Sequence, residues 1–148
     1  MYRLRGKVVS GFGRGSKLLG CPTANLDPAA FSSIVVGAPR GVYAGFAQVG
    51  PDRSSPVYKT VLSFGTNPSF ADSQHDTVES YILHDFSADF YDQELSLVIV
   101  AYMRPMEKYE GMEKLVAAIA RDVRVGDVAM EREPFSKFKQ DEFFKKTQ

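Results

Sequence analysis

The 148-residue sequence has one cysteine, no tryptophan and no excess of either charge. A lone thiol, Cys21, cannot form an internal disulfide, which is typical of proteins in a reducing compartment. Lys and Arg together number 18, as do Asp and Glu, so no net field favours a polyanion or an anionic membrane. No apolar run approaches the roughly 18 residues of a membrane span, and no signal peptide is apparent. We therefore expect a cytoplasmic protein that binds neither nucleic acid nor membrane.

The length suits one domain covering residues 1–148, with a barrel over about 3–104. Runs rich in β-branched and aromatic residues, bounded by Gly, Pro, Asn, Asp and Ser, predict strands in this part. The runs are residues 3–10, 41–49, 57–64, 77–83 and 94–103. Few intervening segments are long enough for a helical crossover, which favours an antiparallel sheet or small closed barrel of five or six strands.

After Pro105 the apolar period changes from two to between three and four. Acidic residues early, arginines late and Gly126 as a stop together predict an amphipathic helix over about 107–125. The tail, 127–148, is charged but carries four phenylalanines. Either a docked extended arm or a short second helix would fit it.

Three segments have residues suited to chemistry. In the stretch Gly11–Lys17, glycines would let backbone N–H groups converge on an anion, although a plain surface turn is an equal alternative. In an extended segment, Thr23 and Asn25 would point to one side and offer two oxygens to a hard cation, while a capped turn is the simpler interpretation. In a strand, Glu79 would share a face with Tyr81 and Leu83, which suits either a base in a partly desolvated pocket or an ordinary glutamate on the outer face of a barrel.

In order along the chain, these and several further motifs resemble the riboflavin kinase family. The matching stretches are Gly6–Asn25, Gly41–Gly45, Gly65–Pro68, Val78–Leu83, Asp89–Tyr91 and Arg104–Pro105, followed by Tyr109 and Leu115. The resemblance implies a mainly β fold, a six-stranded antiparallel Greek-key β-barrel with a C-terminal α-helix packed on it.

The same resemblance implies an enzyme that transfers the γ-phosphate of ATP to the 5′-hydroxyl of riboflavin, giving FMN and ADP. It makes Glu79 the catalytic base and places Thr23 and Asn25 at the metal and phosphates, with Mg²⁺ expected and Zn²⁺ or Mn²⁺ possible. The remaining nucleotide-binding residues that it implies are Gly11, Lys17, Ile82, His84 and Tyr91. The flavin-binding residues that it implies are Arg104 and Tyr109.

Riboflavin, FMN, ATP and ADP are thus the expected partners, and the protein is expected to be a monomer. The main alternative is a barrel that binds a flavin or nucleotide without chemistry. Glu79 distinguishes the two interpretations, because a carboxylate near a phosphate would only repel the ligand of a simple binding module.

Overall fold

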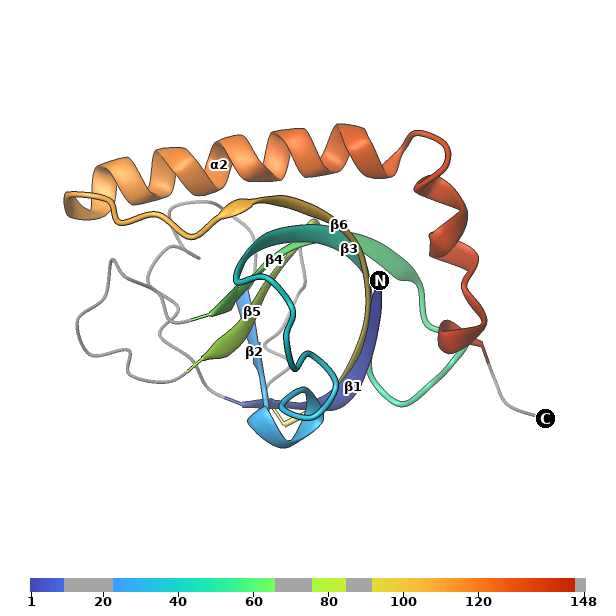
Figure 1. Cartoon of the computed structure of the whole chain (residues 1–148). Helices are drawn as coiled ribbons and strands as arrows, with labels where there is room; N and C mark the ends of the chain where they lie inside the picture. Colours follow the sequence, from blue (N-terminus) through green and yellow to red (C-terminus); the bar gives the residue numbers. More distant parts are fainter. Residues whose placement is uncertain (10–22, 66–75, 85–91, 146–148) are drawn as a thin grey trace.

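The computed structural model describes residues 1–9, 23–65, 76–84 and 92–145. Its six strands close into a barrel in the order β1-β2-β5-β4-β3-β6, and every neighbouring pair is antiparallel (Figure 1). The strands are β1 (Tyr2–Val9), β2 (Thr23–Leu26), β3 (Gly41–Val49), β4 (Val57–Gly65), β5 (Thr77–Ile82) and β6 (Glu94–Pro105). The predicted fold class is confirmed.

The shortest strand, β2, lies between β1 and β5 and is buried over all four residues. Val8 of β1 faces Leu26, and Glu79 of β5 faces Asn25. The strand-forming runs in the sequence did not include this segment, because four residues are too few to establish a period of two. Its place in the barrel fixes which residues lie beside Glu79.

The barrel interior is filled by alternate apolar residues of every strand, as a period of two requires. Among the most deeply buried side chains, with at most 2% exposed, are Leu4, Leu26, Leu62, Ile82 and Leu97. In β5 the inward residues are Val78, Ser80 and Ile82, which leaves Glu79 and Tyr81 on the outer face. The sequence left open which face of this strand points into the barrel, and the structure places Glu79 on the outer face.

Helix α2 (Gly111–Met130) lies along the outside of the barrel (Figure 1) and runs later and longer than the predicted 107–125. It starts at Gly111 because a residue at φ 80° turns the chain out of an extended segment, which glycine does without strain. Gly126 does not end the helix. A Cβ there would lie 2.5 Å from Cγ2 of Val61, so this glycine permits close packing of the helix on β4.

The first residues of the predicted tail continue α2 to Met130, and two 3-10 helices follow, η2 (Ser136–Gln140) and η3 (Glu142–Phe144). Another 3-10 helix, η1 (Pro28–Ala30), follows β2. Phe144 is 2% exposed in a cluster with Phe46 and Val98. The carboxylate of Asp141 accepts hydrogen bonds from Arg3 at 3.0 and 2.7 Å, which lowers its pKa. The tail is therefore docked on the barrel. In the described part of the chain, no helix has the length and apolar character to cross a membrane.

Candidate active site

A row of polar side chains crosses the outer face of three neighbouring strands. Asn25 of β2 and Ser63 of β4 are the direct cross-strand partners of Glu79 in β5. Directly opposed residues of antiparallel strands present their side chains on the same face, with Cβ atoms about 5 Å apart. Thr23 and Tyr81 form the next pair on this face. The barrel thus brings together three residues predicted from the sequence, Thr23, Asn25 and Glu79.

Glu79 is half-buried, and its Oε1 accepts a hydrogen bond of 2.7 Å from the hydroxyl of Tyr81. Burial raises the pKa of the Glu79 carboxyl, because it penalises the charged form, and the hydrogen bond from Tyr81 opposes this by favouring the carboxylate. A carboxylate with a raised proton affinity is suited to accept a proton from an alcohol.

Thr23 and Asn25 are buried, with 7% and 8% of their surfaces exposed. The side-chain oxygen of Asn25, Oδ1, has no hydrogen-bond partner even though it is buried. A buried acceptor without a partner is costly, and such groups are rare outside sites that take a ligand, ion or water. Two uncharged oxygen donors beside a carboxylate fit a hard cation whose remaining ligands are phosphate oxygens.

Of the other residues predicted to bind nucleotide, the structure describes Ile82 and His84, and neither joins this row. Ile82 points into the barrel core and is fully buried. The ring of His84 stacks on Tyr58, with centroids 4.1 Å apart and an angle of 21° between the rings. Gly11, Lys17 and Tyr91 lie outside the described residues.

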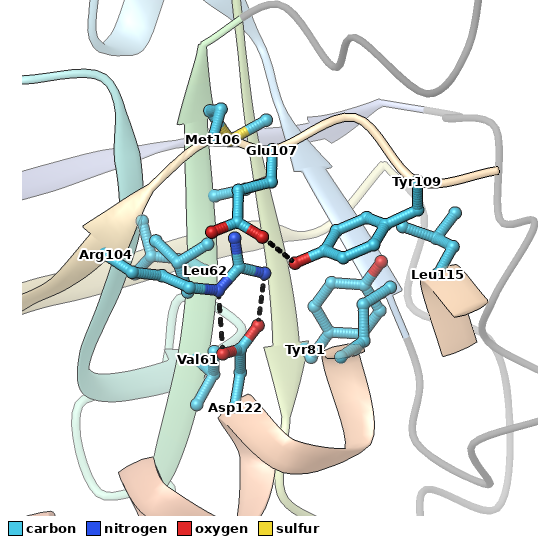
Figure 2. A pocket seen from close by; sticks show the side chains of 12 residues that line it. Val61, Leu62, Tyr81, Arg104, Met106, Glu107, Tyr109, Leu115 and Asp122 are labelled. Atoms are coloured by element: carbon cyan, nitrogen blue, oxygen red, sulfur yellow. Dashed lines mark hydrogen bonds and ion pairs between the residues drawn. The ribbon is translucent and has the colours of Figure 1, made fainter. Parts of the chain in front are cut away.

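A second cluster surrounds Arg104, at the end of β6. Its Nε and Nη2 donate to the two carboxylate oxygens of Asp122 in α2, at 3.0 and 2.6 Å. Figure 2 shows the guanidinium between the carboxylates of Asp122 and Glu107. The Tyr109 hydroxyl donates to Glu107 at 2.9 Å, and the Tyr109 ring centroid is 5.7 Å from Cζ of Arg104. The two residues predicted on the flavin side, Arg104 and Tyr109, are therefore neighbours.

These contacts surround a cavity of about 40 Å³ between α2, the outer face of the barrel and the chain after β6 (Figure 2). Its walls include Val61, Ser63, Tyr81, Met106, Leu115 and Ile119. The hydrogen bond to Asp122 raises the pKa of the Arg104 guanidinium, and burial is the largest cause that raises the pKa of the Tyr109 hydroxyl. Most of the strand and helix residues that line the cavity are apolar, and its charged lining residues are Arg104, Glu107 and Asp122.

The sequence did not single out Asp122 or the role of the Tyr81 hydroxyl. Asp122 follows Leu115 and Ile119 at helical spacing, so it lies on the buried face of α2, and its side chain is only 6% exposed. A charged residue at an apolar position of the helical pattern is the signal that would have identified it. Within the described ranges, no three His, Cys, Asp or Glu side chains form a group that could hold a metal ion.

Comparison with known proteins identifies the family of this chain. The family model described as riboflavin kinase matches residues 1–129. The chain belongs to the riboflavin kinase family. The riboflavin kinase of Homo sapiens is 39% identical over 143 residues, which cover 97% of this chain and 90% of that protein. A bifunctional riboflavin kinase/FMN phosphatase of Arabidopsis thaliana is 41% identical, but the match spans only 37% of that longer protein.

The crystal structure of riboflavin kinase from Trypanosoma brucei has the same fold. It superposes with a TM-score of 0.73 at 25% identity and covers 99% of this chain and 90% of that one. The predicted family, fold and enzyme class are therefore confirmed. The roles of individual side chains in this riboflavin kinase stay predictions from their chemistry and placement.

Proposed function

We propose that this member of the family transfers the γ-phosphate of ATP to the 5′-hydroxyl of riboflavin, with Glu79 as the general base. One observation carries the proposal. Half-buried Glu79 is the cross-strand partner of Asn25, whose buried Oδ1 has no hydrogen-bond partner, and Tyr81 on the same face of β5 borders the Arg104 cavity. A single outer surface thus offers a base, oxygen ligands for a cation and an adjoining apolar cavity.

Phosphoryl transfer through a loose transition state requires mainly that the enzyme align the two substrates and neutralise the charge on the phosphates. Glu79 would accept a hydrogen bond from the riboflavin 5′-hydroxyl, orient it toward the γ-phosphorus and take its proton late in the transfer. Burial of Glu79 supports this role, because it raises the proton affinity of the carboxyl. The hydrogen bond from Tyr81 opposes this rise in the pKa of Glu79, because it favours the carboxylate.

Thr23 and Asn25 would hold the divalent cation that accompanies ATP. Mg²⁺ is the expected ion, because both side chains offer hard, uncharged oxygens, and Zn²⁺ or Mn²⁺ are alternatives. The bound cation would neutralise charge on the phosphates. Since neither side chain is charged, phosphate oxygens and water would supply the other ligands, so cation and nucleotide are expected to bind together.

Arg104 and Tyr109 would contact the flavin from the chain that leaves β6. A cavity of about 40 Å³ is far smaller than the several hundred Å³ of sites that hold ring systems of this size. Riboflavin binding therefore requires the segment containing Arg104 and Tyr109 to move away from α2. Opening would separate the Tyr109 ring from Leu115 and Ile119, and closing of the same segment would then enclose the flavin.

For the nucleotide side, Gly11 and Lys17 are proposed to cover the phosphates, and His84 and Tyr91 to border the adenosine. The side chain of Ile82 lies in the core, so any contact from this residue would come from its backbone. A cytoplasmic location and a monomeric state stay predictions from the sequence.

The direct test is to incubate the protein with riboflavin, ATP and Mg²⁺ and to separate the products by chromatography. We expect FMN and ADP in equal amounts. Glu79→Gln should lower kcat by about 100-fold or more and leave ADP binding nearly intact. Glu113→Gln, an exposed residue of α2, is the matched control and should be fully active. Full turnover in Glu79→Gln would refute the base, and flavin binding without product would favour the non-catalytic barrel.

The cation site has its own test. Asn25→Ala should raise the Mg²⁺ concentration needed for half-maximal activity, because the variant loses an oxygen ligand. An unchanged Mg²⁺ requirement in both Asn25→Ala and Thr23→Ala would place the cation elsewhere.

A further inference from the structure

We propose that Tyr81 is a positioning residue for the base, whose hydroxyl holds Oε1 of Glu79 so that Oε2 faces the hydroxyl of the substrate. This inference rests on the proposed role of Glu79 as the base. It adds a second side chain to the chemistry, one that acts through Glu79 and touches neither phosphate nor reacting oxygen.

The contact between the two side chains has the geometry of a strong hydrogen bond. The phenol of Tyr81 donates to Oε1 of Glu79 at 2.7 Å, and Tyr81 is only 7% exposed. Hydrogen bonds from a neutral donor to a carboxylate are short, and they gain strength away from water. In the described part of the chain, Oε2 of Glu79 makes no hydrogen bond. One carboxylate oxygen is therefore engaged, and the other is available to a substrate.

Packing holds the ring of Tyr81 in place. Leu115 and Ile119 of α2 are buried against it, and Tyr109 and Val123 are partly buried in the same cluster. Tyr81 also forms part of the wall of the cavity beside Arg104. A tyrosine fixed by its ring has few remaining rotamers, so its hydroxyl can orient a carboxylate at little further cost in entropy. Tyr81 therefore contacts α2, the cavity and Glu79 at the same time.

The simpler explanation is that Tyr81 is a packing residue whose hydroxyl takes the nearest acceptor. The two explanations predict different effects when only the hydroxyl is removed. A packing residue would lose a little stability and no turnover. A positioning residue would change the protonation and the orientation of Glu79, and so change kcat and its pH dependence.

Tyr81→Phe tests this, because it keeps the ring and removes the hydroxyl. We expect kcat to fall roughly tenfold to a hundredfold, the loss associated with a hydrogen bond to a charged group, while KM for both substrates changes little. The acidic limb of the kcat profile should move to higher pH, because the phenol favours the ionised carboxylate. Tyr102→Phe, which removes the hydroxyl of a tyrosine on β6 that is 47% exposed, is the matched control and should match the parent.

Two further measurements separate this inference from the proposed function. An NMR titration of ¹³C-labelled glutamate carboxyls, without substrate, should give Glu79 a higher pKa in Tyr81→Phe, with Glu79→Gln identifying its signal. Adding Tyr81→Phe to Glu79→Gln should lower kcat no further, because Tyr81 acts only through Glu79. If Glu79→Gln is inactive but Tyr81→Phe has parental kcat and an unchanged Glu79 pKa, this inference alone is overturned. If Glu79→Gln retains its turnover, the base assignment fails and the role of Tyr81 fails with it.

Discussion

Asp122→Asn is expected to destabilise this riboflavin kinase, because Asp122 compensates a mostly buried guanidinium. The side chains of Asp122 and Arg104 are 6% and 17% exposed, and they form two hydrogen bonds, of 3.0 and 2.6 Å. Asparagine keeps one acceptor but loses the charge and the second acceptor. One charge-assisted hydrogen bond is worth about 1.5–3 kcal/mol. Removing one partner of a wholly buried pair costs about 3–5 kcal/mol.

Since Arg104 retains some access to water, we expect a loss of about 2–3 kcal/mol in the free energy of unfolding. In a domain of this size that lowers Tm by roughly 4–12 °C. Urea unfolding followed by circular dichroism would measure the first quantity, and a thermal melt the second.

The matched control is Glu142→Gln, which removes an exposed ion pair to Lys145 whose atoms are 3.5 Å apart. Such surface pairs contribute little, so this variant should unfold like the parent. Combining Arg104→Met with Asp122→Leu should recover most of the stability lost in Asp122→Asn, because no buried charge is left alone. The reasoning is refuted if Asp122→Asn stays within about 0.5 kcal/mol of the parent, the range of ordinary surface substitutions.

Two other predictions concern stability. Burial raises the folded-state pKa of Glu79 above its unfolded value of about 4.3, so stability is lost as pH rises through the folded pKa. The Tm of Glu79→Gln relative to that of the parent should therefore rise as the pH increases above about 4.3. A difference in Tm that does not change with pH would contradict this prediction. Gly126→Ala places a Cβ 2.5 Å from Cγ2 of Val61 and should cost about 1–3 kcal/mol in urea unfolding. The cost should shrink in a Val61→Ala background, and an equal cost in both backgrounds would rule out this contact as its cause.

Much of the fold could be predicted from local pattern. Alternation of apolar residues located five of the six strands, and a change of period after Pro105 located the helix. The errors fell where local pattern and packing disagree. Gly126 resembles a helix stop, yet the helix continues through it because the residue lies against Val61. The four residues of β2 are held as a strand by pairing with β1 and β5, which no local propensity reveals.

For the candidate site, too, the sequence predicted some features and the packing of the chain decided others. Residue type and motif order indicated Glu79, Thr23 and Asn25, because their chemistry suits a base and a cation site. The sequence could not indicate that Asn25 faces Glu79, since that depends on the register between strands far apart in the chain. It also could not pair Arg104 with Asp122 or Tyr81 with Glu79.

The sequence by itself therefore determined a β-rich domain, its family and the residue types available for chemistry, because these depend on composition and on patterns over short stretches. Only the tertiary structure decided that Glu79 lies on the outer face of β5 and which residues contact Glu79 and Arg104. Those relations depend on barrel closure and on the docking of α2, which are set by packing among residues distant in the chain.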